Sequence, residues 1–218
     1  MVSMKKYTAI VLSVLIFCSS CLGVSADIQL KADGSGRIAL EYRFSRMAET
    51  IGRLDGNERW NIIPAGRADF ERTAARIPGM KIVSFSSRET GSDILNRVTL
   101  DFTNTEALLK FLDSSGGASF INNGNSAALN IILMEPVSSE INADLMELMQ
   151  QVSEGYFVYI SFNTDRDAAL SITDGTGKII TAPQAVVVPN GRRTSFSIGT
   201  GELMKLSLGV GLQLEIRN

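Results

Sequence analysis

Residues 28–44 read IQLKADGSGRIALEYRF, and this stretch decides how the chain begins to fold. Apolar side chains alternate with polar ones on both sides of Asp33-Gly34-Ser35-Gly36, which is the pattern of half-buried strands. Glycine-rich turns of this kind join two antiparallel strands. The stretch therefore predicts a β-hairpin that directs one face of each strand to a core.

The chain that follows has more strand patterns than helix patterns. Helices are predicted over 47–54, 67–77 and 141–152, and another begins near Thr103, which has capping-box spacing to Glu106. Strands are predicted over 80–85, 98–102, 120–121, 127–134, 156–162, 168–173, 178–181, 184–188, 194–198 and 204–216, with glycines 209 and 211 as candidates for a bend in the last one.

These elements predict an α+β fold with a mainly antiparallel sheet. Three or four short helices are expected on one face of the sheet, and the C-terminal third is expected to be rich in strands. We expect residues 21–135 and residues 136–218 to pack together as one unit.

The first 26 residues have the order of an export signal. Lys5 and Lys6 precede an apolar run over 8–17, and a zone of small residues follows. Because a membrane span needs about 20 apolar residues, this run is too short to be a permanent anchor.

Two cleavage positions compete within this signal. A cut before Cys21 makes residues 1–20 the signal and leaves a cysteine for lipid attachment. This position abuts the apolar run, although Cys18 stands where leucine is usual. A cut after Ala26 makes residues 1–26 the signal and fits the rule of small residues, but it leaves a gap of nine residues after Phe17. The abutting apolar run favours the first cut.

Composition excludes several classes of function. The chain has no histidine, and both cysteines lie in the signal region, so the body cannot form a disulfide scaffold. Catalysis by Ser-His-Asp or Cys-His groups and zinc sites of the usual kind are excluded as well. We therefore expect no catalytic residue, no metal and no cofactor, and a protein that is not an enzyme.

Charge argues against a nucleic-acid partner. Residues 27–218 retain 19 basic and 23 acidic side chains, because the signal contains two lysines and no acid, and their net charge is −4. Proteins that bind nucleic acid usually have a basic face.

Three other groups of residues were considered as sites. Asp165, Asp167 and Asp174 offer oxygen ligands for calcium, but the twelve-residue loop with its terminal glutamate is absent. The Asp33-Gly34-Ser35-Gly36 and Asp174-Gly175-Thr176-Gly177 segments lack P-loop spacing, so hairpin turns are favoured over phosphate cradles. Arg192 and Arg193 beside a turn are basic residues that an anionic head group would meet, although solvated arginines are the simpler interpretation.

The N-terminal half resembles the LppM-like domain of bacterial envelope lipoproteins. The resemblance covers roughly residues 21–135 and rests on the Asp33 hairpin, the Val98-Thr-Leu-Asp-Phe102 strand before a leucine-rich helix, and the exported cysteine. In that family the hairpin follows the lipidated cysteine by about a dozen residues, and here Asp33 follows Cys21 by twelve. Many relatives end in a membrane helix that is missing here.

The resemblance implies an α+β domain on the outer side of a membrane, of undefined activity, with lipid binding suspected for some members. It assigns one residue, Cys21, as the acyl acceptor. We therefore expect an exported envelope lipoprotein that is held to the membrane by a lipid anchor and binds a lipid, another apolar ligand or an envelope protein without catalysis.

Two other interpretations stay open. One is a structural or assembly module that acts through its sheet edges, and the other is a carboxylate-dependent hydrolase. Cleavage after Ala26 would instead give a soluble periplasmic or secreted protein.

Overall fold

The computed structural model describes residues 22–45, 66–112, 117–123, 126–134, 153–206 and 208–217, together with Glu147 and Gln151. These residues form ten strands and three helices. In chain order they are β1 (Leu22–Leu30), β2 (Gly36–Ser45), α3 (Arg67–Arg76), β3 (Met80–Glu89), β4 (Asp93–Phe102), α4 (Thr105–Leu112), β5 (Ala118–Asn122), β6 (Ser126–Met134), β7 (Phe157–Thr173), β8 (Val186–Val188), β9 (Asn190–Gly199), α6 (Thr200–Met204) and β10 (Val210–Arg217).

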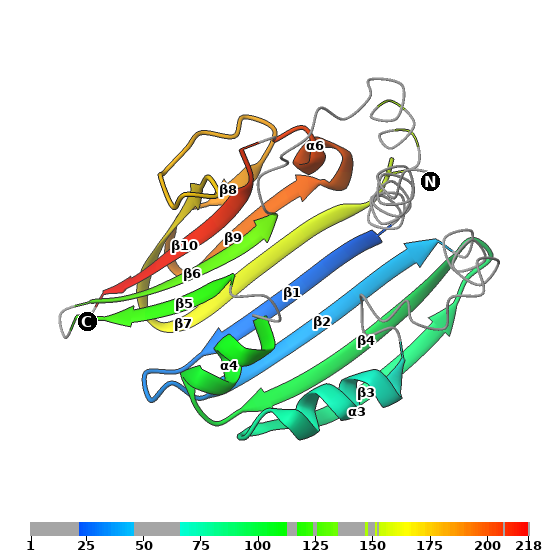
Figure 1. Ribbon diagram of the computed structural model, residues 1–218, viewed down its shortest axis with the longest axis horizontal. Helices are drawn as coiled ribbons and strands as arrows, with labels where there is room; N and C mark the ends of the chain where they lie inside the picture. Colours follow the sequence, from blue (N-terminus) through cyan, green and yellow to red (C-terminus); the bar gives the residue numbers. More distant parts are fainter. Residues whose placement is uncertain are drawn as a thin grey trace, which may run out of the picture.

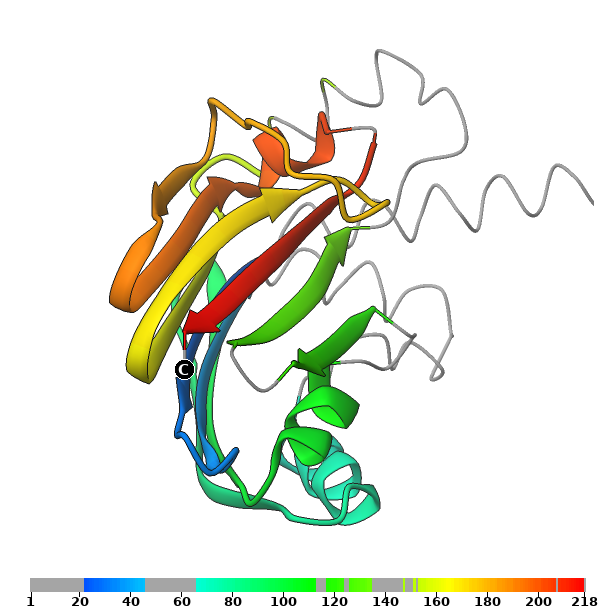
Figure 2. The same cartoon turned by 90° about the vertical axis from the view of Figure 1, so that its left-hand side faces the viewer.

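The strands form one sheet in the order β3-β4-β2-β1-β7-β10-β6-β5, with β9 paired to β7 and β8 paired to β9. β1 and β7 run parallel, and the other described pairs are antiparallel. The sheet is strongly curved, and α3 and α4 lie inside its curve (Figures 1 and 2). A mainly antiparallel α+β fold is therefore confirmed.

The predicted hairpin is formed by β1 and β2, but β1 starts earlier than the alternation indicated. Leu22 to Ala26 lie opposite Phe44 to Leu40 of β2. On the other side, Val24 to Ala26 lie opposite Val158 to Ile160 of β7. Residues that the sequence placed around a cleavage site thus form half of a strand in the interior of the sheet.

Two glycines shape the turn of this hairpin for different reasons. Gly34 has a φ of 82°, in the region that favours glycine. At Gly36 a Cβ atom would lie 1.9 Å from the carbonyl oxygen of Gln29. The Asp33 carboxylate accepts the Ser35 N–H at 2.9 Å and the Ser35 hydroxyl at 2.7 Å. The segment is therefore a self-closed turn, as predicted.

The inner face of the sheet is apolar. Residues that pair directly across strands share a face, and Ile28, Ile38 and Leu100 lie side by side at 1% exposure or less. On the same face, the ring of Phe70 from α3 lies 6.0 Å from the rings of Tyr42 on β2 and Phe85 on β3. This side of the sheet holds the core.

The outer face carries charges in pairs. Arginines and carboxylates of neighbouring strands form the ion pairs Arg37–Asp101, Arg97–Glu41, Arg43–Asp93 and Arg193–Asp27. β1, β2 and β4 thus have an apolar side toward the core and a more polar side away from it, which explains the alternation in their sequences.

The helices confirm one prediction and correct another. α3 forms where it was predicted, and Phe70 and Ala74 are buried as its periodicity required. The capping box of α4 is wrong: the side chain of Asn104, not Thr103, accepts the N–H of Ala107 at 2.9 Å. Glu106 instead pairs with Lys110 one turn later. The helix begins one residue later, because the amide oxygen of Asn104 takes the N-cap role.

β7 is one long strand where two were predicted. Its register with β9 jumps from the pair Asn163–Arg193 to the pair Ala168–Gly191, so that residues 164–167 form a bulge. Before the bulge β7 pairs with β1, and after it with β10. The bulge therefore lies where β7 leaves one neighbour for another.

The predicted strand over 204–216 is wrong in its first half. Residues 200–204 form α6, and β10 begins at Val210. Gly209, with a φ of 78°, separates them, and Leu208 is 67% exposed although its place in the alternation predicted burial. Likewise, the predicted strand over 178–181 is reduced to one bridge between Ile179 and Thr173.

Some predictions fall on residues that the structure does not describe. Cys21, the signal before it and the predicted helix over 47–54 lie there, as does the helix over 141–152 apart from Glu147 and Gln151, which are helical. No helix among the described residues has the length and apolar character needed to cross a membrane.

Candidate binding pocket

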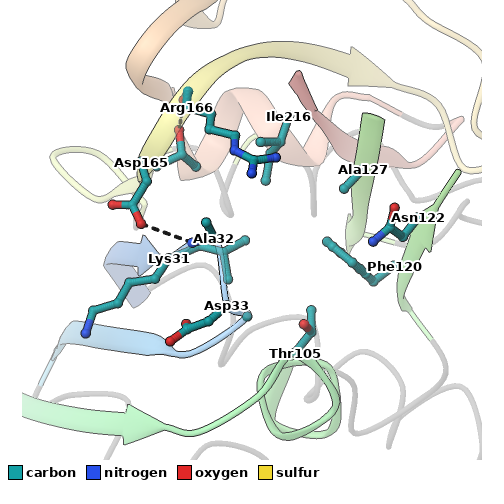
Figure 3. A pocket seen from close by; sticks show the side chains of 13 residues that line it. Lys31, Ala32, Asp33, Thr105, Phe120, Asn122, Ala127, Asp165, Arg166 and Ile216 are labelled. Carbon is teal, nitrogen blue, oxygen red and sulfur yellow. Dashed lines mark hydrogen bonds between the residues drawn. The ribbon is translucent and has the colours of Figure 1, made fainter. Parts of the chain in front are cut away.

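A pocket of about 190 Å³ lies at the end of the sheet where the β1–β2 turn, the β7 bulge and the last residues of β10 meet. β5, β6 and the start of α4 close it from the opposite side (Figure 3). Its lining is Leu30, Lys31, Ala32, Asp33, Gly34, Thr105, Phe120, Asn122, Ala127, Thr164, Asp165, Arg166 and Ile216. The site is therefore assembled from segments far apart in the sequence.

The β7 bulge forms one wall of the pocket. Thr164, which is 8% exposed, donates its hydroxyl to the carbonyl of Arg166 at 2.7 Å and so fixes the bulge. The Asp165 carboxylate accepts the backbone N–H of Ala32 at 3.0 Å. This bond fastens the bulge to the β1–β2 turn, so the wall consists of two segments held together.

The opposite wall comes from the other arm of the curved sheet. Phe120, Asn122 and Ala127 lie across the pocket from Ala32 and Asp165 (Figure 3). The turn also contacts α4, because a Cβ on Gly34 would lie 2.7 Å from the Thr105 hydroxyl.

The pocket combines an apolar floor with a charged rim. Leu30 and Ala127 are buried, and Phe120 and Ile216 are half-buried. The rim carries Lys31, Asp33, Asp165 and Arg166, two of each sign. In Figure 3 the Arg166 side chain extends toward Ile216, whereas Lys31 points away from the pocket. An apolar group with a polar end matches this lining.

The two carboxylates of the rim are already engaged. The hydrogen bonds from the side chain and backbone of Ser35 lower the pKa of Asp33, so this group stays ionised at neutral pH. Asp165 holds the Ala32 amide. A general acid needs a raised pKa, and Asp33 has the opposite. Asp33 therefore does not suit the role of a general acid.

A second polar cluster lies at the other end of the sheet. Asp93, 5% exposed, accepts the Tyr156 hydroxyl at 2.8 Å and the Arg43 Nε at 2.8 Å. Burial by itself would raise the pKa of Asp93, but the bonds from Tyr156 and Arg43 outweigh it and lower the pKa. Burial and the bond to Asp93 raise the pKa of Tyr156 to about 12. All three groups are satisfied by one another, which makes the cluster a structural tie between β2, β4 and β7.

Among the described residues, Asp165, Asp167 and Asp174, which the sequence offers as calcium ligands but favours as residues of a solvated loop, do not form a group that could hold a metal ion. Asp165 lies in the bulge, and Asp174 follows the end of β7, about 30 Å away along an extended strand. Asp174 instead closes its own turn by accepting the Thr176 N–H at 2.8 Å and the Thr176 hydroxyl at 2.6 Å. Asp165 thus links the bulge to the β1–β2 turn, Asp174 closes its own turn, and the second glycine-rich segment is a turn as predicted.

The structure also shows where Arg192 and Arg193 lie. Arg193 lies on the outer face of the sheet, with its NH2 3.8 Å from Asp27, and the carbonyl of Arg192 accepts the Thr164 hydroxyl at 3.3 Å. Neither residue lines the pocket. The sequence did not indicate Phe120, Arg166 or Ile216, because no local pattern marks residues that meet only through folding.

No protein-family model matches the chain, and no curated protein matches it in sequence. Its structure is similar to the NMR structure of the folded domain of LppM from Mycobacterium tuberculosis, with 12% sequence identity and a TM-score of 0.45. The match covers 90% of each chain. This solved domain bears the name of the family that the sequence motifs resemble. The likeness is weak, and it identifies no ligand, activity or site residue.

Proposed function

We propose that this protein is an exported lipoprotein of the bacterial envelope that binds an apolar or amphiphilic group without catalysis. The observation that carries the binding function is the pocket, whose lining combines apolar side chains with charged residues of both signs. The proposed location is the extracytoplasmic side of a membrane, with Cys21 as the site of the lipid anchor.

The pairing of β1 supports cleavage before Cys21. Leu22 to Ala26 pair with β2, and Ala26 is 6% exposed within the core. A cut after Ala26 would remove half of this strand and expose the edges of both neighbours. A cut before Cys21 leaves β1 whole.

The volume of the pocket limits the size of the ligand that it can bind. Pockets for drug-sized ligands occupy about 300–1,000 Å³, and this one has about 190 Å³. It therefore accepts one apolar group with its polar end, such as a short acyl segment or one side chain of a partner.

Two measurements test this function. The intact mass of the protein from its native envelope is expected to match a chain that begins at an acylated Cys21, and the mass of an unmodified chain from Asp27 would end the lipoprotein hypothesis. For the pocket, the soluble body is titrated with dihexanoyl-phosphatidylglycerol while amide chemical shifts are followed. Shifts are expected to concentrate at Phe120, Ala127 and Ile216.

A pair of variants makes the titration specific. Ile216→Trp fills the pocket and is expected to abolish the shifts, while Ile179→Trp, at a residue that is 62% exposed outside the pocket lining, leaves them unchanged. The amide spectra of both variants report whether they are folded. Shifts spread evenly over the surface, or retained in folded Ile216→Trp, would contradict binding in the pocket.

A second candidate function is assembly through a sheet edge. β8 pairs only with β9 among the described strands, and it exposes Val186 at 69% and Val188 at 49%. An exposed apolar edge can accept another strand. Val186→Lys combined with Val188→Lys is expected to abolish any self-association seen by sedimentation. If the protein were monomeric at all concentrations, the hypothesis of assembly between copies would be excluded.

A further inference from the structure

We infer that the domain stands on the membrane by the end of the sheet at which β1 begins, so that the pocket faces away from the bilayer. This inference rests on the proposed lipid anchor at Cys21. It adds the orientation of the domain relative to the membrane, and it limits the side from which a ligand can enter the pocket.

The first step is the absence of a spacer between the anchor and the fold. Cys21 directly precedes Leu22, and Leu22 is already paired with Phe44 of β2. A flexible linker would let a domain tumble above the membrane. Here no residue lies between the acylated position and an interior strand, so the start of β1 is held at the membrane surface.

The second step is the length of β1. The strand runs from Leu22 to Leu30, and the pocket is lined by residues that immediately follow, Lys31 to Gly34. Eight steps of about 3.3 Å put these two ends about 26 Å apart. Figure 1 shows β1 running from the end of the sheet at which β2 ends toward the β1–β2 turn at the opposite end. The pocket is therefore at the end remote from the anchor.

The third step is an exposed aromatic side chain beside the anchored end. A Cβ on Gly23 would lie 3.5 Å from both the Phe157 carbonyl and the Tyr156 ring, so these residues flank the start of β1. Phe157 is 56% exposed, although it is large and apolar. Trp and Tyr are enriched at the interface of a membrane with water, and helices that lie in that interface bury Phe there. A membrane surface at this end would cover Phe157.

A limit on the occupant follows from this orientation. The hydrocarbon core of a bilayer is about 30 Å thick, so each leaflet contributes about half of that. If β1 stands along the membrane normal, its length puts the pocket about 26 Å above the surface, and a lipid of the anchoring leaflet would have to leave the bilayer to reach it. The occupant is therefore an apolar group presented from the envelope space.

Energy transfer to labelled vesicles tests the orientation. The acylated protein is bound to vesicles of phosphatidylethanolamine and phosphatidylglycerol that carry an acceptor dye on their head groups. Since the body has no cysteine, Glu154→Cys at the anchored end and Asn123→Cys beside the pocket each take one donor dye. Transfer from position 123 is expected to be at least about twofold lower, because the two ends are about 26 Å apart. Equal transfer from both positions would overturn the inference.

Two further variants separate this inference from the function on which it rests. Cys21→Ser is expected not to float with vesicles, and flotation of the wild type that is equally poor would refute the anchor itself. Insertion of a ten-residue Gly-Ser spacer between Cys21 and Leu22 is expected to keep flotation and to make the two transfer efficiencies converge. If the difference persisted with the spacer, direct attachment would not be what orients the domain.

Discussion

Asp93 shows how much of this fold depends on single side chains. It lies on β4, receives hydrogen bonds from Arg43 on β2 and from Tyr156 just before β7, and is almost fully buried. The guanidinium of Arg43 also lies 5.2 Å from the centre of the Tyr156 ring. Three strands that are distant in sequence are thus tied at one end of the sheet.

We expect Asp93→Ala to lower the free energy of unfolding at pH 7 by about 1–3 kcal/mol, because the Tyr156 hydroxyl loses its acceptor and Arg43 its partner. Urea denaturation measures this change. Asp101→Ala is the matched control, since Asp101 and its partner Arg37 have side chains more than 40% exposed and their pair contributes less. Equal losses in the two variants would refute a special role for the buried carboxylate.

The same residue predicts how stability depends on pH. Folding lowers the pKa of Asp93 below its usual 3.8, so its contribution is fully present above about pH 4 and is lost as the pH falls through the folded value. Urea midpoints of the wild type should therefore fall below pH 4. In Asp93→Ala this fall should be smaller, and an identical pH profile would show that other carboxylates account for it.

Gly36 offers a test of close packing in the β1–β2 hairpin. A methyl group there would meet the Gln29 carbonyl at 1.9 Å and the Phe102 ring at 2.5 Å. We expect Gly36→Ala to destabilise the protein by about 1–3 kcal/mol, as overpacking does. At Gly91 no atom lies within 4 Å of the added carbon, so Gly91→Ala should leave the melting temperature nearly unchanged. Similar melting temperatures for both variants would contradict the clash.

At the scale of elements, the sequence pattern predicted the elements whose formation depends on residues close together in the chain. The Asp33 turn and α3 were predicted because their signals lie within a few residues. The strand over 204–216 was wrong because strict alternation persists through Leu206 and Leu208, although Gly209 breaks the chain there. Alternation alone cannot distinguish one strand from a helix, a turn and a shorter strand.

The pocket could not be predicted for a related reason. Its walls meet because β1 pairs in parallel with β7, across more than 130 residues of sequence, and because β7 then changes partner at its bulge. Neither event has a local signal in the sequence. The sequence offers Asp165 as an oxygen ligand for a metal, and the structure gives it another partner in Ala32.

The bulge itself can be tested through that partner. We expect Asp165→Ala to raise the exchange rate of the Ala32 amide with solvent about 5- to 10-fold, since a lost hydrogen bond costs about 1 kcal/mol. Hydrogen exchange followed by NMR gives this rate directly. Asp167→Ala, in the same bulge and also exposed, should leave the Ala32 rate unchanged. An unaltered rate in Asp165→Ala would show that the bulge is not fastened to the β1–β2 turn.

At the scale of the whole molecule, β1 joins the two arms of the sheet. It lies between β2 and β7, and Ala26, Ile28 and Leu30 are buried beneath the helices. In the strand order, β2, β3 and β4 are hydrogen-bonded to the rest of the sheet only through β1. The stability of the fold should therefore depend on how much of β1 the exported protein retains.

Two shortened chains test this dependence. A chain that begins at Leu22 keeps the whole of β1, whereas one that begins at Asp27 lacks five residues that pair with β2, three of which also pair with β7. Each lost strand hydrogen bond costs about 1 kcal/mol, so we expect a loss on the order of 5 kcal/mol. Because domains are stable by about 5–15 kcal/mol, the shorter chain should unfold at much lower urea concentration or not fold at all. A third chain, with residues 22–26 replaced by glycine and serine, restores the backbone without the side chains and should lie between the two. If the chains from Leu22 and Asp27 unfolded at the same urea concentration, release after Ala26 would be compatible with this fold, and the structural support for a mature chain that begins at Cys21 would be lost.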